Sequence, residues 1–150
     1  MAPQLRDGSH NLIARYDHNF GARDTLTVRY GWGSQNLLEP LAQETTDVPG
    51  FGNYSDNSGH NIAVQHQRVW SASVVQTTRL AYNRSFRNSH PFNSDTNVGA
   101  LWGVNWLNVA PRSYGYPTIK VTGYSQVGDA DSLPLETRSG IWQVHEGVSV

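Results

Sequence analysis

The pattern that decides the fold is NLIARYDHNF at residues 11–20, followed by GARD at 21–24 and TLTVRYGWGSQ at 25–35. Alternate residues of the first stretch form one mostly apolar set: Leu12, Ala14, Tyr16, His18 and Phe20. The second stretch repeats this with Leu26, Val28, Tyr30 and Trp32. A period of two is typical of β-strands, because successive side chains point to opposite faces of a sheet. With the short GARD turn between them, the two stretches predict a hairpin over residues 11–36.

The same alternation returns over residues 60–88 and again from residue 140. Residues on one face of the second predicted hairpin are Ile62, Val64, His66, Trp70, Val74, Thr78, Leu80, Tyr82 and Phe86. A fifth strand is predicted over residues 140–150, with Trp142, Val144 and Val148 on one face. The predicted fold class is therefore all-β, with antiparallel up-and-down strands.

The connections alternate in length. Short turns follow Phe20 and Trp70, whereas long outer loops rich in Gly, Pro, Ser, Asn and Asp are predicted over 37–59 and 89–139. Short turns on one side and long loops on the other are typical of outer-membrane β-barrels. The other face of the strands carries Arg15, Arg29 and Arg79, which would face a polar lumen. An antiparallel sheet with one solvated face would give the same alternation.

Composition argues against several classes of function. Lys and Arg total 11 against 12 Asp and Glu, so there is no basic surplus to bind nucleic acid. The chain has no cysteine, and its six histidines show no metal-binding spacing, so neither a metal nor another cofactor is expected. No apolar run approaches the ~18 residues of a membrane-spanning helix. No catalytic constellation is present in the sequence, and the protein is not expected to be an enzyme.

Several segments resemble TonB-dependent outer-membrane receptors, most closely the Oar-like subgroup, in which a carboxypeptidase-regulatory-like domain precedes the plug. RYDHNF at 15–20 resembles that group's R-x-D-H-N-F strand. WSASVVQTTRLAYNR at 70–84 resembles the hairpin F-S-P-x-x-x-N-x-x-R-x-G-Y-N-R, with Trp70 in place of Phe. YPTIKVTGYSQVGD at 116–129 resembles the outer-loop segment P-x-x-x-V-T-G-Y-x-x-L-G-D. The similarity extends over nearly the whole chain.

The resemblance implies a barrel of roughly twenty-two strands around a plug, of which this chain would supply about five. Residues 1–150 would then be an internal fragment, with Met1 an internal methionine. The implied function is TonB-energised uptake of a bulky solute, with a glycan or peptide favoured over a siderophore. The implied partners are the plug and other strands of the same receptor, the inner-membrane TonB complex and outer-membrane lipid. The implied location is the bacterial outer membrane, with the long loops extracellular.

The loop over 89–139 contains the candidate ligand-binding residues, which are Trp102, Trp106, Tyr114, Tyr116 and Tyr124. Aromatic rings beside amides can stack on sugars or peptides. These rings could instead pack the loop against itself, as in other compact surface loops. The alternative for the whole chain is a soluble β-sandwich that binds carbohydrate, which would need two buried inner faces.

Overall fold

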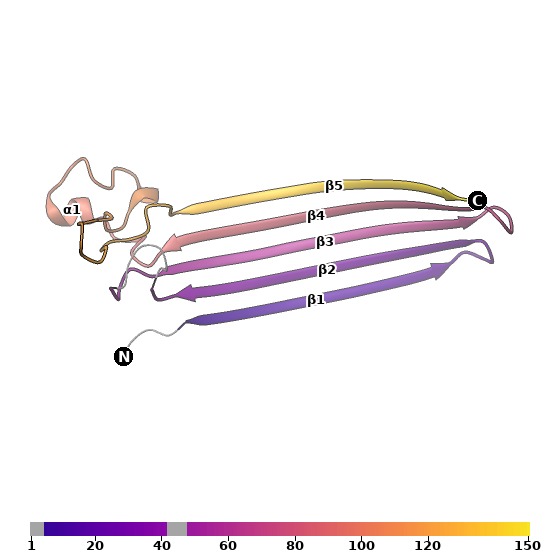
Figure 1. Cartoon of the computed structure of the whole chain (residues 1–150), viewed down its shortest axis with the longest axis horizontal. Helices are drawn as coiled ribbons and strands as arrows, with labels where there is room; N and C mark the ends of the chain where they lie inside the picture. Colours follow the sequence, from indigo (N-terminus) through magenta and orange to yellow (C-terminus); the bar gives the residue numbers. More distant parts are fainter. Residues whose placement is uncertain (1–4, 42–47) are drawn as a thin grey trace. The chain divides into compact units, whose positions relative to one another are not determined.

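The computed structural model describes residues 5–41 and 48–150. Its strands are β1 (Arg6–Asn19), β2 (Asp24–Glu39), β3 (Asn53–Val69), β4 (Val75–Pro91) and β5 (Leu135–Ser149). They form one sheet in which each strand pairs with the next in chain order (Figure 1). The connection between β4 and β5 contains a short helix, α1 (Val98–Trp102), and one 3-10 turn (Pro111–Ser113). The predicted all-β fold with up-and-down antiparallel strands is confirmed.

The strands are longer than predicted at the ends that meet the long connections. The hairpins predicted over 11–36 and 60–88 extend over Arg6–Glu39 and Asn53–Pro91, and the fifth strand begins at Leu135 rather than at residue 140. The sequence underestimates these ends because polar residues occupy both faces there, as in NYSDNSG at 53–59. The backbone still pairs, but the alternation that reveals a strand is lost.

The two predicted outer loops are correspondingly shorter. The loop predicted over 37–59 is reduced to residues 40–52, of which 42–47 lie outside the described residues, as does Met1. The loop predicted over 89–139 is reduced to residues 92–134. None of the helices in the described part of the chain is long and apolar enough to cross a membrane.

The chain divides into two compact parts. The strand part comprises His10–Ser34, Ser58–Phe86 and Arg138–Val150, and the loop part comprises Met1–Ser9, Gln35–Asn57 and Arg87–Thr137. Both short turns belong to the strand part. The backbone amide of Phe20 donates to the carbonyl of Asp24 at 2.9 Å, and that of Trp70 donates to the carbonyl of Val74 at 2.9 Å.

One face of the strand part, formed by even-numbered residues, is predominantly apolar and is called the apolar face below. Leu12, Leu80 and Val144 are exposed on it, as the alternation predicts. Three further residues of the same face, namely Leu26, Val28 and Val64, are half-buried. They lie on strands with a neighbour on each side, and flanking side chains cover part of their surface.

The opposite face, called the polar face, consists of odd-numbered residues joined by hydrogen bonds between strands. Arg15 pairs with Asp17 at 2.6 Å, and Thr27 donates to the same carboxylate at 2.6 Å. Arg79 donates to Gln65 across β3 and β4 at 2.6 Å. The predicted separation of apolar residues from arginines 15 and 79 is therefore confirmed.

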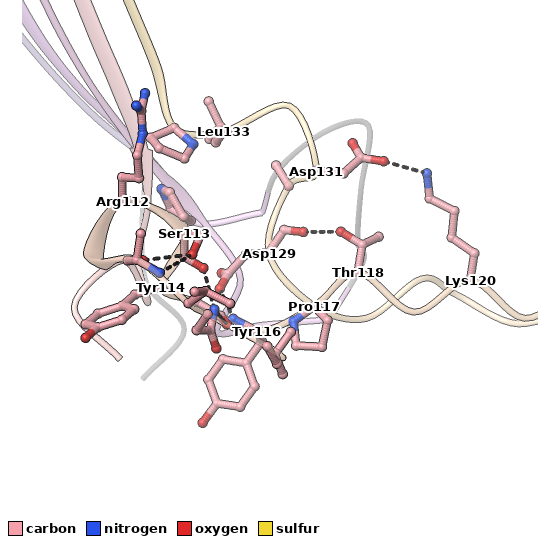
Figure 2. A pocket seen from close by; sticks show the side chains of 18 residues that line it. Arg112, Ser113, Tyr114, Tyr116, Pro117, Thr118, Lys120, Asp129, Asp131 and Leu133 are labelled. Carbon is pink, nitrogen blue, oxygen red and sulfur yellow. Dashed lines mark hydrogen bonds and ion pairs between the residues drawn. The ribbon is translucent and has the colours of Figure 1, made fainter. Parts of the chain in front are cut away.

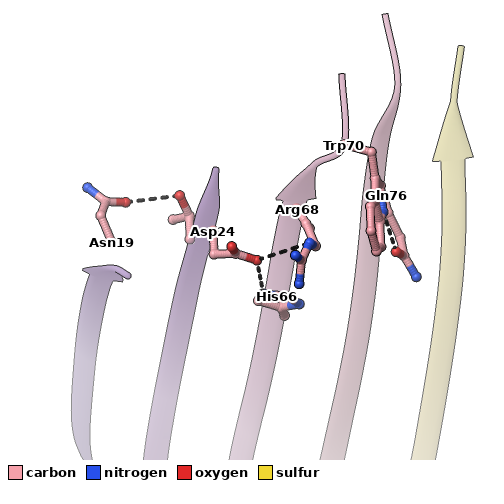
Figure 3. A network of polar contacts seen from close by, with 7 residues as sticks. Asn19, Asp24, His66, Arg68, Trp70 and Gln76 are labelled. Carbon is pink, nitrogen blue, oxygen red and sulfur yellow. Dashed lines mark hydrogen bonds and ion pairs between the residues drawn. The ribbon is translucent and has the colours of Figure 1, made fainter. Parts of the chain in front are cut away.

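Polar side chains lie along the end of the apolar face that is nearest the short turns (Figure 3). Asp24 lies 3.1 Å from His66 and 3.8 Å from the guanidinium of Arg68. That guanidinium also lies 4.4 Å from the centre of the Trp70 ring. The indole of Trp70 donates to Gln76 at 2.8 Å. These contacts connect β2, β3 and β4 along one edge of the apolar face.

The sheet has almost no dry core of its own. Among the described residues, the buried apolar side chains are Ala81, Pro91, Val98 and Ala130. A soluble β-sandwich would bury two inner faces against each other. The described strands instead form a single sheet, so the alternative of a soluble sandwich module was wrong.

Candidate functional site

A cavity of about 910 Å³ lies within the loop part, in the connection between β4 and β5 (Figure 2). Its walls are formed by Pro91, residues 107–110, 112–118, Lys120, residues 129–131, Leu133 and Pro134. Sites for small molecules usually measure roughly 300–1,000 Å³, so the cavity is at the large end of that range. Its lining combines ring, amide and charged groups, and it is the candidate functional site.

Asp129 organises one wall of the cavity. Its carboxylate is only 4% exposed and accepts hydrogen bonds from the Asn93 side chain at 2.9 Å and the Tyr116 backbone amide at 2.7 Å. Its own carbonyl accepts from the Thr118 hydroxyl at 2.5 Å. Residues that are far apart in the sequence are thus joined at one buried carboxylate, beside the short antiparallel bridge between Ile119 and Val127.

The wall also depends on close backbone approach at two glycines. Gly115 and Gly128 have φ angles of 127° and 104°, which favour glycine. A Cβ added at Gly128 would overlap the carbonyl oxygen of Pro117, and one added at Gly115 would press on the carboxylate of Asp129. The sequence therefore permits two segments of the loop to pack more closely than side chains would allow.

Asn108 connects the cavity to α1. Its side-chain oxygen accepts from the Gly99 amide at 2.9 Å, and its side-chain nitrogen donates to the carbonyls of Ser113 and Gly115. The helix begins at Val98, which is fully buried, and the Asn97 side chain caps it by accepting from the Ala100 amide at 2.9 Å. The loop therefore has a small buried centre and a defined internal structure.

The structure brings together only some of the predicted ligand-binding rings. Tyr114 and Tyr116 line the cavity. Tyr116 also packs edge-on against Phe51 and Trp102, with ring centres 5.8 Å and 6.1 Å away. Trp102 and Tyr116 therefore help to hold the loop together, which was the alternative interpretation of these rings.

Trp102 and the other two predicted rings, Trp106 and Tyr124, do not line the cavity. Trp106 and Tyr124 are each 79% exposed. Trp106 directly precedes the lining residues Leu107 and Asn108, whereas Tyr124 follows a turn closed by its own amide, which donates to the Val121 carbonyl at 3.0 Å. Their ring faces are accessible from solvent, so they remain candidates for stacking on a ligand.

Sequence reasoning missed the charged residues of the cavity. Arg112, Lys120 and Asp131 line it, and the Lys120 ammonium lies 3.1 Å from the Asp131 carboxylate (Figure 2). The available signal was Lys120, the only lysine of the chain. The lining thus offers both signs of charge, amides and two phenol rings. Among residues 5–41 and 48–150, no group of three or more His, Asp or Glu side chains could hold a metal ion.

Comparison with known proteins gave one family. Neither the curated proteins nor the solved structures include a match to the chain. Residues 1–150 match the family model described as an outer membrane beta barrel domain, and the single antiparallel sheet with one apolar face agrees with that match. The sheet is accordingly part of a barrel wall, located in the outer membrane. The chain belongs to the family of outer membrane beta barrel domains.

Proposed function

We propose that the protein is a receptor that captures a bulky solute in the loop cavity for TonB-energised uptake. The observation that carries the proposal is the cavity itself, which is built into a connection between two strands of a barrel wall. Long connections of outer-membrane barrels are extracellular, so this recess would meet solutes before the membrane does. A purely structural loop would not need a recess of about 910 Å³.

The lining favours a glycan or a peptide as the solute. The phenol rings of Tyr114 and Tyr116 offer flat apolar surfaces, and Asn108 also lines the cavity. Arg112 adds a positive charge, and the Lys120–Asp131 pair adds one charge of each sign. Rings with adjacent amides suit sugars, and paired charges suit the termini and side chains of peptides.

The use of TonB is supported by the resemblance of segments 15–20, 70–84 and 116–129 to TonB-dependent receptors. Two of these segments lie in strands, and the third, residues 116–129, contributes Tyr116, Lys120 and Asp129 to the cavity. The segment that resembles an outer loop of such receptors therefore forms part of the candidate site. The resemblance that supports the use of TonB therefore includes residues of the proposed capture site.

The test uses cells that display the full-length receptor and a panel of fluorescent oligosaccharides and peptides. We expect at least one probe to bind the cells and to accumulate inside them. In cells that lack TonB, surface binding should persist and accumulation should stop. Equal accumulation with and without TonB would contradict the proposal and indicate a passive channel. Binding of no probe above that of receptor-free cells would contradict capture at the loops.

A further inference from the structure

A second cavity, of about 420 Å³, lies on the apolar face of the strand part. It is lined by Ser58 and His60 of β3, Arg84 and Phe86 of β4, and Arg138 of β5. We call these five residues the basic pocket. They occupy the strand positions on the side of the long connections, beyond the apolar residues Ile62, Tyr82 and Trp142. The basic pocket therefore lies at the end of the apolar face where the strands lead into the long connections.

The chemistry of the basic pocket suits an anion with several oxygen atoms. Its five residues include two guanidinium groups, an imidazole and a hydroxyl, and none of them is acidic. The guanidinium of Arg138 lies 5.3 Å from the centre of the Phe86 ring, and the His60 ring nitrogen lies 2.9 Å from the Tyr30 hydroxyl. Guanidinium groups match phosphate oxygens in geometry and bind them with charge-assisted hydrogen bonds.

The position of the basic pocket indicates that the anion belongs to a lipid. The apolar face of a barrel wall is turned toward lipid, and aromatic rings mark the level of the headgroups. Directly beside the pocket, the rings of Tyr82 and Trp142 lie 4.5 Å apart on β4 and β5. The exposed side chains of Leu80 and Val144 continue from these rings along the same face. A phosphate in the pocket would thus lie at headgroup level, with apolar surface for acyl chains beside it.

The opposite end of the apolar face, beside the short turns, contains acidic side chains. There, Asp24 accompanies His66 and Arg68 (Figure 3). Glu146 accepts hydrogen bonds of 2.6 Å from both Gln76 and Thr78 at the same end. At this end Arg68 is accompanied by the carboxylates of Asp24 and Glu146, whereas the charged side chains that line the basic pocket are both guanidinium groups. An anionic headgroup is therefore favoured in the basic pocket.

We propose that the basic pocket binds a phosphate group of a lipid in the outer leaflet of the outer membrane. Arg84 and Arg138 would hold the phosphate oxygens, while Ser58 and His60 would donate further hydrogen bonds. The proposal depends on the family assignment and on the long loops facing outward, and it does not depend on solute uptake.

The test uses the full-length protein purified in neutral detergent and measured by native mass spectrometry. The probes are lipid A, which is an anionic glycolipid with two phosphate groups, phosphatidylcholine, whose phosphate charge is balanced by its choline cation, and inorganic phosphate. We expect the protein to retain lipid A and neither of the other two probes. Replacing both arginines, in Arg84→Gln/Arg138→Gln, should weaken lipid A retention by about tenfold or more, because hydrogen bonds to charged groups are lost.

The matched control is Arg29→Gln/Arg79→Gln on the polar face, which removes the same charge and should leave retention unchanged. Heat-modified migration in gels checks that each barrel is assembled, and Arg84→Gln alone replaces the double variant if that variant does not assemble. Equal loss in the control would show that only net charge matters and would overturn the proposal. Equal retention of phosphatidylcholine, or binding of inorganic phosphate at the same concentration, would also overturn it.

Discussion

The buried carboxylate of Asp129 accepts a hydrogen bond of 2.7 Å from the backbone amide of Tyr116. The same carboxylate holds Asn93, which is 36 residues away in the sequence. One side chain thus joins the beginning, middle and end of the connection between β4 and β5. The shape of the loop cavity depends on it more than on any helix or strand.

Asp129→Ala should therefore loosen the loop while leaving the barrel assembled. Loss of a buried, hydrogen-bonded carboxylate leaves its donors unpaired and costs about 1–3 kcal/mol. We expect faster hydrogen exchange in peptides from residues 92–134 and unchanged exchange in the strands. The matched control is Asp131→Ala, because Asp131 is exposed and pairs with Lys120 at the surface, where an ion pair contributes about 0–1 kcal/mol. Equal effects of the two substitutions would contradict the role assigned to Asp129.

Trp106→Ala and Tyr124→Ala should weaken solute capture without loosening the loop. Both rings are exposed, and a ring that anchors a ligand contributes about 1–3 kcal/mol to its binding. Trp102→Ala, by contrast, removes a ring that packs on Tyr116 and should increase hydrogen exchange in the loop. Binding is measured on cells that display equal amounts of each receptor. Unchanged capture by the Trp106 and Tyr124 variants would show that these two rings are not ligand contacts.

Gly128→Ala should disrupt the cavity, because the added methyl group would overlap the Pro117 carbonyl at a φ of 104°. Gly123→Ala is the control, since Gly123 also has a positive φ but no atom lies within 4 Å of the added Cβ. The control carries the backbone strain of about 1 kcal/mol alone. We expect protease cleavage within residues 92–134 to accelerate much more for Gly128→Ala. Similar cleavage rates would mean that close packing at Gly128 is not required.

The strands could be predicted from sequence because their information is local. Leu26, Val28 and Tyr30 alternate with Thr27 and Arg29, and this pattern by itself gives both the period and the two faces. The strand ends could not be placed, because polar residues such as Asn53 and Asp56 occupy both faces of the strand there. Pairing at these ends depends on the neighbouring strand. The sequence therefore predicts the sheet but underestimates the length of its strands.

The loop cavity could not be predicted for a different physical reason. Asp129 meets Tyr116 and Asn93 through contacts between distant residues, and no periodic signal announces such contacts. Composition indicated an aromatic loop, but it could not separate Tyr116, which packs inside the loop part, from Trp106, which is exposed. Arg112 and Asp131 could not be identified as candidate site residues from the sequence, because only the folded loop places them in the wall of the cavity.

A charge introduced on the apolar face should lower the free energy of unfolding more than the same charge on the polar face. Val64→Arg places a guanidinium on the apolar face and should lower the free energy of unfolding in lipid vesicles by about 2–4 kcal/mol. Ala63→Arg, one residue earlier on the polar face, should have a much smaller effect. Both values come from denaturant titration of the full-length protein refolded into vesicles. A larger loss for Ala63→Arg than for Val64→Arg would reverse the assignment of the faces.

The most direct test of the lipid-facing wall is single-cysteine labelling in vesicles, since the chain contains no cysteine of its own. Cysteines are introduced one at a time over residues 61–66 of β3, labelled with an environment-sensitive fluorophore, and exposed to a quencher attached to lipid acyl chains. The account predicts strong quenching at Ile62→Cys and Val64→Cys and weak quenching at Asn61→Cys, Ala63→Cys and Gln65→Cys. Uniform quenching along the strand, or stronger quenching at the odd-numbered positions, would contradict it.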